Sequence, residues 1–244
     1  MTPAELAPIL APQGTLRATI NIGNPVLAAM PAGAAEPHGV SVDIARELAS
    51  RLGVPVAFVI CATAAKAVEA VKAGACDITF LAVDPARAVD IDYAAPYVVI
   101  EGAYMVKNDS PLTANAEVDR AGHRVAVGKG SAYDLFLTRE IRQAELVRFA
   151  SSQEVVDGFL AQGLDVAAGV KQQLEADARR LPGLRLLPGR FMEIRQAIGA
   201  PKGRGEAAVN YLYAFIEALK ASGFIAAALA RHGIAGAAVA PAGR

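Results

Sequence analysis

Short apolar runs alternate with amphipathic stretches in the first third of the chain. The apolar runs are residues 16–22, 54–61 and 77–83, and each has the length and composition of a buried strand. Residues 42–52 and 63–73 place apolar side chains three and four positions apart, which predicts two helices, and a glycine follows each of them. The order strand–helix–strand–helix–strand predicts a parallel sheet covered by helices.

A second series of the same kind starts at residue 124. Residues 124–127, 145–149 and 164–170 have the pattern of strands. The helices between these strands are expected to begin at two serines, because Ser131-Ala132-Tyr133-Asp134 and Ser151-Ser152-Gln153-Glu154 both fit a capping box. Two similar α/β units in one chain favour a bilobed protein with a ligand-binding cleft between its lobes.

Two extended segments, residues 101–107 and 191–201, lie between these units and predict where the chain crosses from one to the other. Lobe one then comprises residues 1–104 and 197–244, and lobe two comprises residues 105–196. Two crossings of this kind are expected to act as a hinge on which the lobes close over a ligand as rigid bodies. The Ala/Gly/Pro-rich tail from Gly233 predicts a loose or surface-hugging end.

The composition narrows the class of protein. With 244 residues, of which 54% are hydrophobic and 20% charged, the chain is expected to be globular rather than disordered. The formal net charge is zero, so nothing points to a nucleic-acid partner or an anionic membrane surface. No run approaches the roughly 20 apolar residues that a membrane-spanning helix needs.

The residue types that carry metal, nucleotide or disulfide chemistry do not form a motif. His38, His123 and His232 are scattered and no cluster has metal-ligand spacing, so we expect no metal and no cofactor. Residues 128–131, Gly-Lys-Gly-Ser, lack the glycine spacing of a phosphate-binding loop. Cys61 and Cys76 are too few for a disulfide framework, and we expect two buried free thiols.

The first residues leave the cellular compartment open. Residues 1–6 lack the basic segment and apolar core of a secretory signal, and Pro3, Pro8 and Pro12 are expected to interrupt any helix there. The protein is periplasmic if a signal peptide was removed and a start methionine added. It is cytoplasmic if the chain is native as given.

The segment with the clearest chemistry is the one that follows the third predicted strand. Asp84-Pro85 is a favourable helix start, which places Arg87 in the first turn of a short helix at the carboxyl end of a buried strand. Open backbone amides beside a guanidinium make a receptor for a carboxylate. The alternative is a capped surface helix whose arginine points to water.

Several segments, in the order in which they occur, carry a resemblance to a known family. They are Gly14-Thr15-Leu16-Arg17, Gly39-Val40-Ser41-Val42-Asp43-Ile44-Ala45, Asp77-Ile78-Thr79, residues 84–87, Tyr93-Ala94-Ala95-Pro96-Tyr97, residues 125–131 and Gly163-Leu164-Asp165-Val166-Ala167. Over residues 14–232 the chain resembles extracellular solute-binding protein family 3, the polar amino-acid receptors of ABC transporters. The resemblance implies the α/β type II periplasmic-binding fold, with a mostly parallel sheet flanked by helices in each lobe and two hinge crossings.

The same resemblance implies a function and the residues that perform it. By position, Arg87 matches the arginine that clamps the ligand carboxylate, and the backbone at Ala82 matches a strand end that contacts it. Ser131, with the amides of Ala132 and Tyr133, matches the helix start that holds the same carboxylate from the second lobe. We expect a monomeric, non-enzymatic solute-binding protein that captures a small carboxylate ligand, with an ABC transporter permease as its partner.

The chain departs from the family at the end of the last strand of lobe two. An Asp that pairs with the ligand ammonium is usual there, whereas this sequence has Val170, or Lys171 or Gln172 if the register shifts. An ammonium without a carboxylate partner is poorly stabilised in a dry site, so acids without a free α-amino group are expected to bind better than standard α-amino acids.

Two further polar residues and two other functions stay open at this point. Lys66 is either a second cation for the ligand or a solvated helix lysine, and Asn24 is either a ligand contact or an ordinary turn residue. Some relatives of this fold are dehydratases of small carboxylic acids, and a cytoplasmic ligand sensor or orphan binding protein is also compatible with the sequence.

Overall fold

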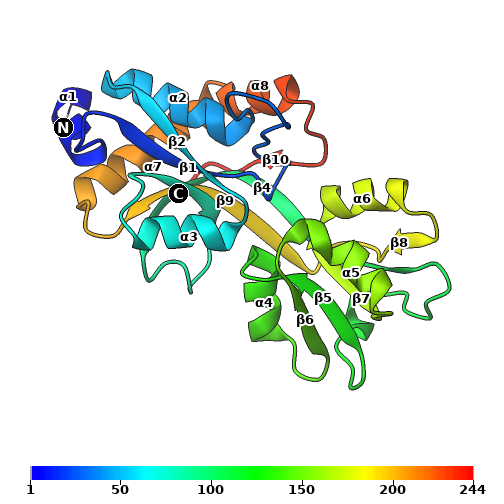
Figure 1. Cartoon of the computed structure of the whole chain (residues 1–244). Coiled ribbons are helices and arrows are strands. Elements are labelled where there is room, and N and C mark those ends of the chain that lie inside the picture. Colours follow the sequence, from blue (N-terminus) through cyan, green and yellow to red (C-terminus); the bar gives the residue numbers. More distant parts are fainter. Residues whose placement is uncertain (1, 244) are drawn as a thin grey trace. The chain divides into compact units, whose positions relative to one another are not determined.

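The computed structural model describes residues 2–243, and these form two compact units (Figure 1). Unit 1 comprises the described residues up to Val99 and from Arg195 onward, and unit 2 comprises Ile100–Ile194. The elements that lie wholly in unit 1 are α1 (Pro3–Leu10), β1 (Leu16–Asn21), α2 (Val40–Leu52), β2 (Val56–Cys61), α3 (Ala64–Lys72), β3 (Thr79–Ala82), α7 (Glu206–Ala221), α8 (Phe224–Arg231) and β10 (Ala238–Val239).

Unit 2 repeats the alternation of strands and helices. Its elements are a 3₁₀ turn (Asn115–Glu117), β5 (Arg124–Gly128), α4 (Ala132–Glu140), β6 (Glu145–Phe149), a second 3₁₀ turn (Ser152–Glu154), α5 (Val155–Ala161), β7 (Val166–Val170), α6 (Lys171–Arg180) and β8 (Leu184–Leu186). Two longer strands, β4 (Ile91–Lys107) and β9 (Met192–Pro201), each have residues in both units.

The sheet of unit 1 brings three loops to one edge. β1 and β2 pair in parallel from Leu16↔Val56 to Asn21↔Cys61, and a parallel bridge between Ala18 and Ile78 places the start of β3 on the other side of β1. β9 pairs antiparallel with β3, and the strand next to it in the sheet on its other side is β4. Because β1, β2 and β3 run in the same direction, the loops that follow them all leave from the same edge.

Unit 2 has the same arrangement. β5 pairs in parallel with β6 on one side and with β7 on the other, and β7 pairs antiparallel with β4. Helices α4 and α5 pack on β5, and the buried residues form two apolar clusters around these strands. The ends of β5 and β7 therefore lie side by side, which places Ser131 and Lys171 at one edge of this sheet.

A helix forms at the amino terminus, where the prolines led us to expect none. Pro3 occupies the first position of this helix. A backbone N–H at that position would have no intrahelical partner, so the proline destabilises the helix little. Thr2 and Glu5 form a capping box, with the amide of Thr2 donating to Glu5 Oε2 at 2.7 Å. Pro8 lies inside the helix, but the full burial of Leu6 and Leu10 anchors it.

Of the two alternatives for the tail, a loose end or a surface-hugging one, the structure shows the second. Residues 238 and 239 form β10, which pairs antiparallel with Val98 and Val99 of β4. The amide of Ala240 donates to the carbonyl of Tyr97 at 3.0 Å, and Lys220 Nζ donates to the carbonyl of Pro241 at 2.8 Å. The tail thereby satisfies backbone groups on that stretch of β4, a requirement that its own sequence does not reveal.

The two serine-initiated helix starts behave differently. Ser131 caps α4 as expected, with its Oγ accepting from the amide of Asp134 at 3.0 Å, although Asp134 bonds back to the amide of Gly130 rather than that of Ser131. The capping box expected at Ser151 is wrong. The Ser151 hydroxyl donates to the Glu154 carboxylate at 2.9 Å, and a 3₁₀ turn precedes α5.

Cys61 and Cys76 are buried free thiols, as predicted. Burial raises the pKa of Cys76 to about 12, so its thiol stays protonated at neutral pH and is a poor nucleophile. Among residues 2–243 no single helix has the length and apolar character to cross a membrane. The pair α7 and α8, bent by 68°, reaches that length and composition only when the two are taken together.

Candidate functional site

Arg87 lies in a short run of hydrogen-bonded turns, not in the helix expected from Asp84-Pro85. The run covers residues 85–90 and ends at Ile91, the first residue of β4, whose amide, like that of Asp90, donates to the Arg87 carbonyl at 3.1 Å. The local mechanism is nevertheless the expected one, because Asp84 Oδ1 accepts from the amide of Ala86 at 2.8 Å. The amides of Arg87 and Ala88 then donate to the Asp84 carbonyl at 3.1 and 2.9 Å.

The Arg87 side chain folds back onto the end of β3 and is 3% exposed, so it does not point to bulk water. Its Nη1 donates to the carbonyl of Ala82 at 3.1 Å, and the hydroxyl of Tyr93 donates to the same carbonyl at 3.0 Å. Burial lowers the pKa of Arg87, an effect that Tyr93 and Asp84 oppose, and burial raises the pKa of Tyr93 to about 12. The result is an enclosed cation at a strand end.

Asn24 and Lys66, which follow β1 and β2, have different surroundings. Asn24 Oδ1 is enclosed and has no hydrogen-bond partner among the residues that the structure describes. Lys66 lies in the first turn of α3, which Thr63 caps by accepting from the Lys66 amide at 3.2 Å. Its Nζ pairs with Glu69 at 2.7 Å on the surface, in the arrangement of an ordinary helix lysine.

In unit 2 the start of α4 is prepared for an anion. The backbone amides of Ala132 and Tyr133, in the first turn, have no hydrogen-bond partner within the helix. The next amide, that of Asp134, donates to Ser131 Oγ. Asp134 would place a negative charge there, but Arg148 Nε pairs with its carboxylate at 2.9 Å. The positive end of the helix dipole is therefore available to a ligand carboxylate.

Tyr133 contributes its backbone to this edge, whereas its ring belongs to the core. The side chain is 2% exposed, and its hydroxyl donates to Ser152 Oγ at 2.7 Å. Gly128, at the end of β5, makes this packing possible because a Cβ there would lie 2.8 Å from the Tyr133 hydroxyl and 2.9 Å from Ser152 Oγ. The missing side chain at residue 128 thus helps to position the α4 start.

We expect Gly128→Ala to destabilise unit 2 by about 1–3 kcal/mol, because the added methyl group overpacks this contact. Urea unfolding followed by far-UV circular dichroism measures the change. The double variant Gly128→Ala/Tyr133→Phe lacks the closest clashing oxygen, so its loss should be smaller than the sum of the two single losses. Strict additivity would show that the Tyr133 hydroxyl does not restrict residue 128.

The end of β7 carries no carboxylate, as the register of the sequence indicated. Val170 is its last residue and pairs with Gly102 of β4, and α6 starts at Lys171. Lys171 Nζ is bound to Glu101 Oε2 at 2.8 Å, and Arg190 Nη1 donates to Glu101 Oε1 at 2.9 Å. These two bonds hold the pKa of Glu101 below its usual range. The cation of Lys171 is therefore already paired within unit 2.

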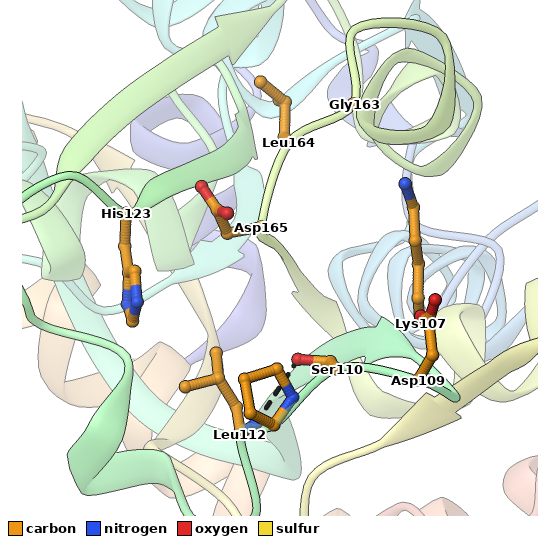
Figure 2. A pocket seen from close by; sticks show the side chains of 9 residues that line it. Lys107, Asp109, Ser110, Leu112, His123, Gly163, Leu164 and Asp165 are labelled. Carbon is orange, nitrogen blue, oxygen red and sulfur yellow. Dashed lines mark hydrogen bonds between the residues drawn. The ribbon is translucent and has the colours of Figure 1, made fainter.

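Unit 2 also has a pocket of ≈ 290 Å³, which lies apart from these residues. Figure 2 shows four of the residues that line it, Lys107, Ser110, His123 and Asp165. Lys107 is the last residue of β4 and Ser110 follows that strand, whereas His123 and Asp165 directly precede β5 and β7. None of the candidate ligand-binding residues contributes to it. Ligands of α/β sheets bind at the carboxyl ends of strands, and this pocket lies at the amino ends of β5 and β7.

Sequence reasoning did not identify the hydrogen-bond partners of Tyr93 and Glu101 at these edges. Tyr93 was noticed only as part of a family segment, yet its hydroxyl shares the Ala82 carbonyl with Arg87. Glu101 lies 70 positions from Lys171 in sequence, and no local pattern joins them. Within residues 2–243 no group of three or more His, Cys, Asp and Glu side chains is arranged to hold a metal ion.

Comparison with known proteins identifies the family. The model of bacterial extracellular solute-binding proteins, family 3, matches residues 16–234, so the chain belongs to this family. The resemblance found in the sequence is thereby confirmed, and solved structures confirm the type II periplasmic-binding fold. A comparison with curated proteins finds no match.

Three solved structures illustrate the range of proteins with this fold. A solute receptor for L-cysteine of Neisseria gonorrhoeae is 26% identical, with a TM-score of 0.78 over 95% of this chain and 93% of that one. A histidine kinase sensor domain is 21% identical, with a TM-score of 0.76 over 89% and 95%. An ancestral amino-acid-binding protein, a precursor of cyclohexadienyl dehydratase, is 19% identical, with a TM-score of 0.76 over 93% and 98%.

Proposed function

We propose that this protein binds a small solute through its carboxylate, an amino acid or a related organic acid, and passes it to an ABC-type permease for uptake. The observation that carries the proposal is the Arg87 guanidinium, which is almost fully buried at the carboxyl end of β3. Burial lowers its pKa, an effect that Tyr93 and Asp84 oppose. A guanidinium at this place can bind a ligand carboxylate through a charge-assisted hydrogen bond.

The start of α4 supports the same ligand chemistry independently. It offers the amides of Ala132 and Tyr133 together with a helix dipole whose nearest carboxylate, that of Asp134, is neutralised by Arg148. Membership of a solute-binding family and the L-cysteine receptor among the solved relatives support a ligand of amino-acid size. The Arg87 guanidinium in unit 1 and the two amides in unit 2 are each suited to bind a carboxylate.

The ligand's second polar group is proposed to be uncharged or anionic rather than an ammonium. Val170 ends β7 without a carboxylate, and Glu101, the carboxylate closest to it along β4, is bonded to both Lys171 and Arg190. A buried ammonium with no anionic partner carries a large desolvation penalty. Acids that lack a free α-amino group avoid this penalty.

A dehydratase activity finds no support in these residues. Such a reaction needs a general acid that holds its proton near neutral pH. Glu101 is the carboxyl group nearest to the end of β7 along the paired strand, and the bonds from Lys171 and Arg190 keep its pKa low, so it is ionised at neutral pH. We therefore propose binding without turnover.

The proposal is tested by a thermal-shift screen of matched acids: common L-amino acids, their 2-hydroxy and unsubstituted analogues, and C4–C5 dicarboxylates. A ligand at a hundred times its Kd stabilises the folded state by about 2.7 kcal/mol, which raises the melting temperature measurably. We expect the desamino acids to give larger shifts than the amino acids. Strong stabilisation by a common amino acid alone would overturn the ligand class, and no shift with any acid would overturn carboxylate binding.

A further inference from the structure

A glutamine on β9 lies beside the arginine turn and was not noticed in the sequence. Gln196 is the register partner of Ala82 in the antiparallel pair of β9 and β3, and the amide of Val83 continues that pairing by donating to the carbonyl of Arg195 at 2.9 Å. Residues directly opposite each other in such a pair project their side chains from the same face. Ala82 has only a methyl group there, so the Gln196 side chain has room next to it.

The surroundings of Gln196 are unusual for a glutamine. It is 6% exposed, and no residue between 2 and 243 forms a hydrogen bond with its side-chain amide. The side-chain amide of Gln196 is nevertheless reachable from outside. It differs in this from Asn24 Oδ1, which is fully enclosed and has no partner. Two other buried polar side chains of unit 1, Thr19 and Thr79, satisfy each other, because their Oγ1 atoms form a hydrogen bond at 2.6 Å.

A nearly buried amide without a protein partner is costly, and proteins retain such a group where something else satisfies it. Gln196 is paired with Ala82, the residue whose carbonyl accepts from Arg87 Nη1. An amide both donates and accepts, so it suits a hydroxyl, an oxo group or an amine. It does not supply the charge that would compensate a buried ammonium.

We infer that Gln196 contacts the bound solute and recognises the polar substituent on the carbon next to the carboxylate held by Arg87. This inference rests on the proposed function, and it adds a specificity-determining residue to the same site. The amide discriminates between substituents at this carbon without supplying a charge. Ligands with a 2-hydroxy or 2-oxo group satisfy it fully.

The test compares acids that differ only at C2 by titration calorimetry: propionate, L-lactate and L-alanine, and likewise glutarate, L-2-hydroxyglutarate and L-glutamate. In the wild-type protein we expect the 2-hydroxy acid to bind about tenfold more tightly than the unsubstituted acid, as one buried hydrogen bond provides. In Gln196→Met, which keeps the length of the side chain, this ratio should fall to within about twofold.

Two further variants make the result decisive. Gln162→Met alters an exposed glutamine at the end of α5 and should preserve the wild-type ratio. Gln196→Asn retains an amide on a shorter side chain, so it should keep part of the preference for the 2-hydroxy acid. This variant also provides a test if Gln196→Met does not fold. Acid binding that depends on Arg87 but shows an unaltered C2 ratio in both Gln196 variants overturns the inference and leaves the proposed function intact. Absence of binding by the wild type to every acid overturns both.

Discussion

Replacing Arg87 with alanine is expected to weaken binding of the best acid from the screen by about 2–5 kcal/mol, that is, roughly 30- to several thousand-fold. The guanidinium is 3% exposed, so a carboxylate bound beside it exchanges water for a charge-assisted hydrogen bond in an enclosed place. Loss of the cation leaves that carboxylate desolvated and under-compensated. Titration calorimetry on the wild type and the variant measures the difference directly.

Two further variants test what the planar guanidinium of Arg87 contributes beyond its charge, and whether loss of any arginine weakens binding. Arg87→Lys keeps the cation but lacks the planar pair of donors, so we expect an affinity between those of the wild type and the alanine variant. Arg179→Ala removes an exposed arginine of α6 and should leave binding unchanged. Equal affinity of the wild type and Arg87→Ala, with both proteins folded, would exclude Arg87 as the carboxylate receptor.

Replacing Asp77 with asparagine is expected to destabilise unit 1 by about 3–5 kcal/mol, because it leaves two arginines without their buried counter-ion. The Asp77 side chain is fully buried and accepts from Arg17 Nη2 at 2.9 Å and from Arg204 Nη2 at 2.7 Å. Arg204 also donates to the carbonyl of Ile9, so this carboxylate joins β1, the residues before β3, the end of α1 and the loop before α7.

The measurement is urea unfolding followed by far-UV circular dichroism, which suits a chain without tryptophan. Glu47→Gln serves as the control, since Glu47 pairs with Arg51 on the surface of α2 and its loss should cost less than about 1 kcal/mol. A loss for Asp77→Asn no larger than for this control would mean that the buried cluster contributes little to stability.

The contribution of Asp77 should also depend on pH in a defined direction. Burial alone would raise the pKa of this carboxyl, but the hydrogen bonds from Arg17 and Arg204 outweigh burial, and the pKa is lowered. A lowered folded-state pKa stabilises the folded protein fully above the ordinary value of about 3.9, and this stabilisation is lost as the pH falls through the folded pKa. The stability gap between wild type and Asp77→Asn should therefore narrow in acid.

The chain order and the local chemistry of the site were accessible to sequence reasoning. The strand that ends at Ala82, the Asp84 turn and the Ser131 cap each depend on residues within a few positions of one another. Periodicity, capping preferences and the family segments act over this same short range, which is why they predicted these features. The helix expected at Arg87 proved to be two successive hydrogen-bonded turns, which end where β4 begins at Ile91.

What only the tertiary structure decided are contacts between residues that lie far apart in the chain. Glu101 meets Lys171, Ala82 pairs with Gln196, Asp77 binds Arg204, and β10 covers part of β4. Each contact depends on strand register and on which elements pack together, and a one-residue slip would turn every side chain of a strand to the opposite face. Sequence alone therefore determined the family, the alternation of strands and helices in the two units and the cation at the strand end, whereas long-range pairing decided which polar groups the protein itself satisfies.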